Sequence, residues 1–167
     1  ATDGAVSRFA IDNNCPTGPL INLSTGWSLA RTDHQHALRR ALNDHQPTTL
    51  WIHLPTISVD KGQPSTVERR MLEFITLICA DQVQRHGNHI LLRAPDKASV
   101  WNAEASATLV KLDGLHSIVW NWCALGVQDL ESKLPLARYE RVLSDLPLEP
   151  LRQTVCNCRA VHQACQG

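Results

Sequence analysis

Residues 48–58 read TTLWIHLPTIS, and this stretch decides the fold that we expect. A polar edge is followed by the run LWIHL at 50–54, and Pro55 then stops the run. A short apolar run bounded by a proline is typical of a buried strand at the centre of an α/β sheet. Ligands of open parallel sheets bind just beyond the carboxyl ends of the strands, so functional residues are expected at positions 55–58.

Helical and strand patterns alternate on both sides of this stretch. We expect strands at 20–23, 49–54, 89–92 and 115–123 and helices from Thr32, from Ser65 to Gly87 and at 103–112, while 136–143 fits either. Ser65 and Glu68 have the spacing of a capping box. The alternation predicts an α/β fold, a Rossmann-like three-layer sandwich with a mostly parallel sheet covered on both faces. We expect one domain over residues 1–167, with a poorly defined segment at 1–15 and a Cys-rich tail at 147–167.

The composition is that of a globular, soluble protein. Hydrophobic residues make up 43% of the 167 residues, and 16 basic residues balance 16 acidic ones. The balance gives no overall field that would draw the chain to nucleic acid or to an anionic membrane. No apolar run approaches the roughly 20 residues that span a bilayer, and the first residues lack a signal-peptide pattern. The compartment stays open.

Three of the six cysteines lie in the body of the chain. Cys79 falls in an apolar helical pattern and Cys123 in an apolar strand pattern, so both are expected to be buried free thiols. Cys15 lies in the turn-like sequence NNCPTGP and is expected to be exposed.

The other three cysteines lie with a histidine in the tail. Three thiolates and an imidazole form a suitable ligand set for tetrahedral zinc, although Cys-x-Cys is tighter than the usual Cys-x2-Cys. A disulfide from Cys156 or Cys158 to Cys165 or Cys15, or free thiols, are the alternatives. The candidate metal ligands are Cys156, Cys158, His162 and Cys165.

The remaining histidines and the tryptophans have simpler expected roles. His34, His36 and His45 are expected to be solvated, and His53 is expected to be a core residue. A hydroxyl–base pair between His53 and Ser58 is the alternative, but no carboxylate is evident to orient it. The five tryptophans are expected to pack in the core, with base stacking as the alternative.

Several short motifs, in order, resemble a methyltransferase-like domain of algal mobile-element polyproteins. That domain is similar to cytosine-C5 DNA methyltransferases and has a Rossmann-like core. The motifs are NLSTGW at 22–27, LWIHLP at 50–55, HILLRAP at 89–95, WCALG at 122–126 and CNC…HQ at 156–163.

The resemblance implies that catalysis is lost. The family has an Asp that contacts the cofactor where this chain has Asn22, and a Pro-Cys nucleophile where it has Pro55 and Thr56. A Glu that hydrogen-bonds the cytosine ring is replaced by Arg93. A Thr hydroxyl is a weaker nucleophile than a thiolate, and an Arg can neither accept a hydrogen bond nor give up its proton. The resemblance thus implies a truncated, degenerate domain.

We therefore expect a non-catalytic, methyltransferase-like module that acts as a binding or structural subunit of a larger assembly, with protein partners and no cofactor. The first alternative is an S-adenosylmethionine-dependent nucleic-acid methyltransferase. The second is a small nucleic-acid-binding module with a zinc-bound tail.

Overall fold

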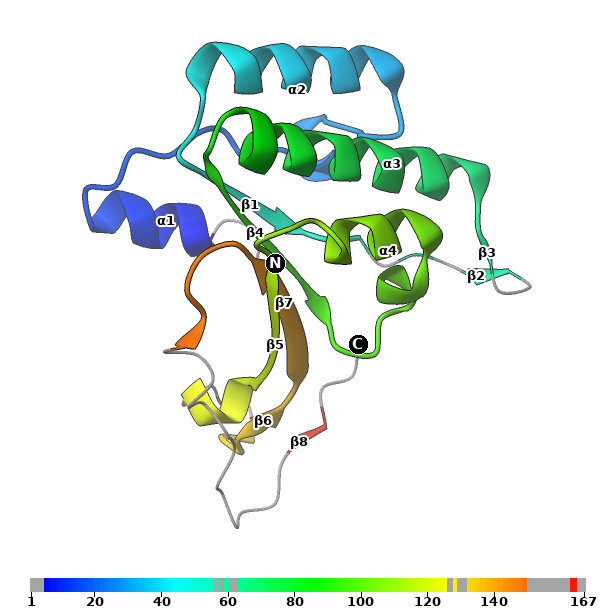
Figure 1. Ribbon diagram of the computed structural model, residues 1–167. Helices are drawn as coiled ribbons and strands as arrows, with labels where there is room; N and C mark the ends of the chain where they lie inside the picture. Colours follow the sequence, from blue (N-terminus) through cyan, green and yellow to red (C-terminus); the bar gives the residue numbers. More distant parts are fainter. Residues whose placement is uncertain are drawn as a thin grey trace. The chain divides into compact units, whose positions relative to one another are not determined.

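The computed structural model describes residues 5–55, 57, 59–60, 63–125, 128, 132–149 and 163–164. The chain divides into two compact units, Ala1–Pro47 and Thr48–Gly167 (Figure 1). Each unit is described by itself.

The first unit contains two helices, α1 (Ala5–Asp12) and α2 (Thr32–His45), and between them the 3₁₀ turn η1 (Leu23–Thr25). The helix expected from Thr32 is confirmed. The prediction of a strand at 20–23 was wrong. The side chains of Asn22 and Thr25 cap a tight turn at this place, and no strand forms. Ser, Thr and Asn side chains compete in this way with regular secondary structure.

The second unit is built on a four-stranded sheet with the order β1-β4-β7-β5. Its strands are β1 (Thr49–His53), β4 (His89–Pro95), β7 (Tyr139–Ser144) and β5 (His116–Asn121). The pairing of β1 with β4 is parallel, whereas β7 is antiparallel to both β4 and β5. The three strands β1, β4 and β5 therefore run in one direction, with β7 reversed between two of them. The expectation of a mostly parallel sheet is not confirmed, since two of the three described pairings are antiparallel.

Strand β1 lies at one end of the sheet as described, and the prediction that it is central was wrong. Its residues alternate between exposed and half-buried, and Trp51 is 40% exposed. In β4 half-buried and buried residues alternate, and Ile90, Leu92 and Ala94 have no exposed surface. The run LWIHL predicted a strand correctly, but an apolar run does not by itself distinguish an edge from a centre.

Two helices connect the strands that run in the same direction. Helix α3 (Thr66–Ala80) begins at the expected capping box, in which the Glu68 amide donates to Ser65 Oγ and the Ser65 amide donates to Glu68 Oε2. It continues as a π-helical turn, η2 (Asp81–Arg85), and Gly87 follows with a φ of +66°. The 3₁₀ turn η3 (Ser99–Asn102) and helix α4 (Glu104–Val110) lead from β4 to β5.

Helices α3 and α4 contact each other (Figure 1). Both crossovers run in the same direction across the sheet, so the right-handed rule places both helices on one face. The main core lies beneath them and includes Leu72, Ile75 and Cys79 of α3, of which none is more than 2% exposed. The buried thiol expected at Cys79 is confirmed.

The opposite face of the sheet has a smaller core of its own. Ile118 of β5, Val142 of β7 and Leu148 pack together, with Leu91 and Trp120 against them. The segment expected as strand or helix at 136–143 forms strands, β6 (Leu136–Ala137) and β7. The short pairs β2 (Val59–Asp60) with β3 (Gln63–Pro64), and β6 with β8 (Gln163–Ala164), complete the described strands. Within the described ranges, no helix has the length and apolarity needed to cross a membrane.

Candidate functional site

The Asn22 side chain is occupied within its own turn. Its Oδ1 accepts hydrogen bonds from Ser24 Oγ at 2.7 Å and from the Thr25 amide at 3.0 Å. Thr25 Oγ1 donates in turn to the Leu20 carbonyl at 2.8 Å, and Gly26 closes the turn with a φ of +83°. The motif NLSTG is thus explained locally as a capped turn. Asn22 belongs to the first unit, so its position relative to the other expected site residues is not described.

Of the other expected site residues, Pro55 lies just after β1, and Arg93 lies in β4 near its carboxyl end. His53 and Arg93 are register partners in the parallel pair, and the Leu54 amide donates to the Arg93 carbonyl at 2.8 Å. Pro55 follows directly. Thr56 and Ser58 lie outside the described residues, so the pair of His53 with Ser58 is not tested. His53 itself is exposed, and the expectation of a core histidine was wrong, because β1 is an edge strand.

Arg93 forms an ion pair with Glu140, a residue that the sequence did not mark as functional. Its Nη1 donates to Glu140 Oε2 at 3.1 Å, and the side chains of Arg93 and Glu140 are 11% and 0% exposed. Arg138 Nη2 lies 3.2 Å from the other oxygen, Oε1. Two guanidinium groups therefore share one fully buried carboxylate, and the three side chains carry a net charge of +1.

The sheet register explains why these side chains meet. Val142 lies opposite Arg93, and Glu140 lies opposite Pro95 on one side and Trp120 on the other. Side chains of directly opposed residues share one face of a sheet, and diagonal neighbours remain within reach of long side chains. Arg93 and Glu140 are such diagonal neighbours. Removing a carboxylate from water costs several kcal/mol, which the two arginines offset.

Tryptophan rings cover the arginines at this end of the sheet. The Arg93 Cζ lies 5.9 Å from the centroid of Trp51, and the Arg138 Cζ lies 4.8 Å from that of Trp122. Contacts of this kind contribute about 0.5–1 kcal/mol at exposed sites and more where water is excluded. Trp122 begins a 3₁₀ turn after β5, so the strand expected through residue 123 ends two residues earlier than predicted.

A third pair of the same type lies on the other face of the sheet. Arg141 donates through Nε and Nη2 to Asp96 Oδ1, at 3.1 Å and 2.9 Å, and its Cζ lies 5.5 Å from the Trp101 ring. Arg141 alternates with Glu140 along β7 and therefore belongs to the other face of the sheet. Three of the five tryptophans thus lie against an arginine. The sequence does not show this interleaving, because each arginine is distant in the chain from its ring.

Three buried polar atoms of neighbouring side chains lack a hydrogen-bond partner among the described residues. They are Arg93 Nε, Trp120 Nε1 and Glu140 Oε1. The 3.2 Å approach of Arg138 to Oε1 is a close ion pair that lacks the alignment of a hydrogen bond. Buried polar groups in proteins are nearly always satisfied, so each of these atoms calls for an explanation.

The cysteines in the part of the chain that the structure describes are free thiols. Cys79 and Cys123 are buried and Cys15 is exposed, as expected. Burial raises the pKa of the Cys79 thiol to about 12, so this thiol stays protonated at neutral pH. A thiol in that state is neither a nucleophile nor a metal ligand.

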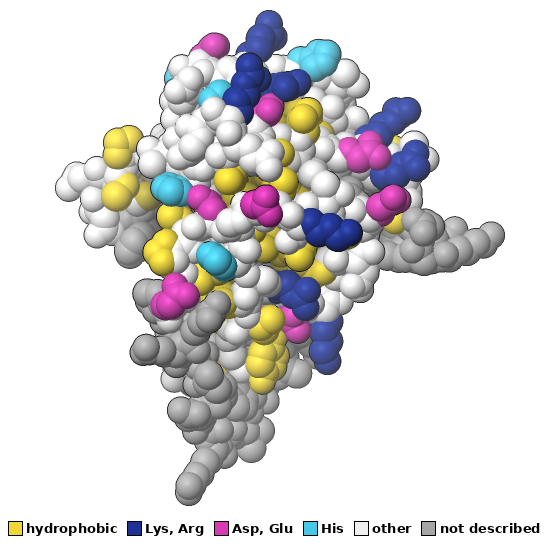
Figure 2. Space-filling view, viewed as in Figure 1, with side chains coloured by type: hydrophobic (Ala, Val, Ile, Leu, Met, Phe, Trp, Pro, Cys, Tyr) yellow, Lys and Arg dark blue, Asp and Glu magenta, His cyan; other side chains and the backbone are white. Residues whose placement is uncertain are grey.

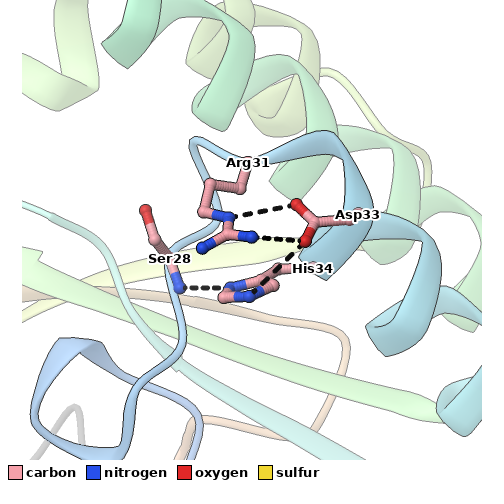
Figure 3. Close-up of polar contacts among 4 residues, drawn as sticks. All are labelled: Ser28, Arg31, Asp33 and His34. Carbon is pink, nitrogen blue, oxygen red and sulfur yellow. Dashed lines mark hydrogen bonds and ion pairs between the residues drawn. The ribbon is translucent and has the colours of Figure 1, made fainter.

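A second polar cluster lies at the start of α2 (Figure 3). The Ser28 amide donates to His34 Nδ1 at 2.9 Å, and Arg31 donates to both carboxylate oxygens of Asp33 at 3.1 Å and 2.6 Å. The hydrogen bond from Arg31 lowers the pKa of Asp33. His34 is 22% exposed and accepts a backbone hydrogen bond, so the expectation of a solvated residue was wrong here.

His36 and His45 are exposed, as expected. Basic and imidazole side chains gather over α2 (Figure 2). A surface hollow of about 490 Å³ on α2 is lined by His36, Arg39, Arg40 and Asn43. These residues are three or four positions apart in sequence, so they lie along one face of the helix.

The expected zinc ligands Cys156, Cys158, His162 and Cys165 lie outside the described residues. Within the described part of the chain, no group of three or more His, Cys, Asp or Glu residues is arranged to hold a metal ion.

Comparison with known proteins adds no family to this description. No protein-family model, curated protein or solved structure matches the chain. The function is therefore argued from the site itself.

Proposed function

We propose that this chain is a non-catalytic, methyltransferase-like module with a Rossmann-like core, and that it acts as a binding or structural subunit of a larger assembly. The observation that carries the proposal is the ion pair between Arg93 and Glu140.

The Rossmann-like part of the proposal is supported by the direction of the strands. Strands β1, β4 and β5 run the same way and are joined by crossovers that contain α3 and α4. The reversed strand β7 is the last of the four in sequence, so it is added after the βαβαβ order is complete.

The loss of catalysis is supported by the contacts that Arg93 makes near the carboxyl end of β4. Arg93 stands where the resemblance implies a Glu, and its guanidinium is committed to Glu140 and covered by Trp51. An arginine cannot act as a general acid or accept a hydrogen bond. Glu140, the nearby carboxylate, is fully buried and held by two arginines. Neither residue can take the role of the missing Glu.

A role in binding is supported by exposed apolar side chains on the two end strands of the described sheet. Trp51 on β1 is 40% exposed and Val119 on β5 is 48% exposed. Strands at the end of a sheet present backbone groups that a partner strand can pair with. Large apolar residues beside such backbone groups favour a protein partner.

Calorimetric titration of the purified chain with S-adenosylmethionine tests the proposal. We expect no saturable heat of binding at cofactor concentrations up to the millimolar range. A saturable signal with a micromolar Kd would overturn the proposal in favour of an active methyltransferase. The Arg93→Lys variant is the matched control, since it keeps the charge and loses the planar guanidinium. A signal that changes in this variant would place the cofactor at this end of the sheet.

A nucleic-acid-binding module is the second candidate, and the pairs of Arg93 with Trp51 and of Arg138 with Trp122 favour it. Arginine and exposed aromatic rings together bind single strands by charge and by stacking. Fluorescence anisotropy with a labelled single-stranded oligonucleotide tests this candidate, because such binding weakens steeply with added salt. Metal analysis of the same preparation tests the tail, where one zinc per chain supports the expected ligand set.

A further inference from the structure

We propose that the carboxyl end of the sheet holds a binding site for a single oxyanion group, a carboxylate or a phosphate, formed by Arg93, Arg138 and Trp120. Glu140 positions the two arginines. The inference goes beyond the proposed function, because it concerns a ligand and holds whether or not the chain binds S-adenosylmethionine.

Two buried donors are left without acceptors at this place. Arg93 Nε and Trp120 Nε1 are both buried, and neither has a hydrogen-bond partner within the described residues. Both groups are donors only, so an acceptor alone can satisfy them. Leaving a buried donor unpaired costs free energy, which makes two such donors on one face of the sheet a signal of something that binds there.

The sheet register brings the two donors to the same place. Trp120 lies directly opposite Glu140, and Arg93 donates to Glu140 from the strand on the other side of β7. The two donors therefore flank one carboxylate on one face of the sheet. Glu140 Oε2 already accepts from Arg93 Nη1, and Oε1 faces Arg138.

The charge at the site selects the class of ligand. Two guanidinium groups against one carboxylate leave one positive charge, and the side chains of Arg93 and Glu140 are at most 11% exposed. A buried charge without a partner is unfavourable, so a ligand with one negative charge completes the site. A carboxylate or phosphate also accepts several hydrogen bonds at once from arginine.

The position of the site in the sheet and the partial exposure of Arg138 agree with this assignment. The carboxyl ends of strands that run in the same direction are the usual place for ligands of α/β sheets. Arg138 is 28% exposed, so its guanidinium reaches from the buried carboxylate toward solvent. Trp122 covers its other side and keeps the guanidinium in place.

Amide and indole resonances in nitrogen–proton correlation spectra give a direct test. The Trp120 Nε1–H resonance is identified as the one missing from Trp120→Phe. Sodium phosphate and sodium acetate are titrated separately, with sodium chloride at the same ionic strength as the reference. We expect a saturable shift of this resonance with at least one of the two oxyanions and not with chloride. The two arms distinguish a phosphate from a carboxylate ligand.

The Trp120→Phe variant is expected to weaken the affinity about tenfold or more, as measured by backbone amide shifts, because it removes one hydrogen bond to a charged ligand. Trp101→Phe is the matched control and should keep the wild-type affinity, since that indole already donates to the Pro95 carbonyl at 2.9 Å.

Three results would overturn the inference. They are a Trp120 resonance that does not shift with either oxyanion, a shift that chloride reproduces, and an affinity that Trp120→Phe leaves unchanged. The first result is the one expected if water alone satisfies the two donors. Should Trp120→Phe fail to fold, the titration of the wild-type protein decides, with the Arg93 Nε–H resonance as the second reporter. A negative result here leaves the titration with S-adenosylmethionine unaffected, so the two proposals fail separately.

Discussion

The carboxylate of Glu140 and the guanidinium of Arg93 meet at 3.1 Å on one face of the sheet, and neither side chain is more than 11% exposed. Buried ion pairs contribute little net stability, but losing one partner is costly. This pair therefore ties the carboxyl end of β4 to β7 and fixes which charges are present at the candidate site.

Replacing Glu140 by Gln should destabilise the protein by about 3–5 kcal/mol, because Arg93, whose side chain is 11% exposed, and the half-buried Arg138 lose their shared carboxylate. Urea denaturation at neutral pH measures the change in the free energy of unfolding. Glu149→Gln is the control, since Glu149 is exposed and its substitution should cost no more than about 0.5 kcal/mol. Equal midpoints for the two variants would show that Glu140 is not held as described.

Replacing His34 by Phe should loosen the start of α2. The ring volume is kept, but the Ser28 amide loses the acceptor that now lies at 2.9 Å. The expected cost is about 1 kcal/mol. Hydrogen exchange of the Ser28 amide should become faster, whereas His36→Phe, at an exposed position, should leave it unchanged. Unchanged exchange in His34→Phe would contradict the geometry in Figure 3.

Cys79 should make the protein less stable at alkaline pH. Burial raises the pKa of this thiol to about 12 from 9.0, so the unfolded chain releases the proton first as the pH rises. The stabilisation is complete below pH 9.0 and is lost between the two pKa values, by up to about 1.4 kcal/mol per pH unit. The difference in unfolding free energy between the wild type and Cys79→Ala should shrink accordingly from pH 9 to pH 10. A constant difference would mean that the thiol ionises in the folded state.

Replacing Ser65 by Ala should cost about 1 kcal/mol, because the Glu68 amide loses the hydroxyl that caps α3 at 3.2 Å. Thermal unfolding followed by circular dichroism measures the loss. Ser117→Ala, at an exposed position on β5, is the control and should change the midpoint little. Equal midpoints for the two variants would contradict a capping role for Ser65.

The features predicted correctly from the sequence are those set by neighbouring residues. The capping box at Ser65, the end of the helical segment before Gly87 and the existence of β1 depend on local spacing. The position of β1 at one end of the sheet depends on what pairs with it, and the reversed strand β7 depends on contacts about 50 residues away in the chain. Apolar patterning does not encode such pairings.

The candidate site could be predicted only in part. The sequence placed Arg93 just after a strand at 89–92, whereas β4 continues to Pro95 and includes Arg93. It gave no reason to select Glu140, because β7 carries polar and apolar residues on both of its faces. Glu140 stands between Tyr139 and Arg141 in YERVLS, which marks no buried position, and its role depends on Arg93, its diagonal neighbour on β4.

A double-mutant cycle between Arg93 and Glu140 tests the central claim most directly. The free energies of unfolding of the wild type, Arg93→Met, Glu140→Gln and the double variant are compared under one set of conditions. If Arg93 is committed to Glu140, the coupling energy should be about 1.5–3 kcal/mol. Additive effects within about 0.5 kcal/mol would show that the two side chains act independently. The claim that Glu140 holds Arg93 in place would then be wrong.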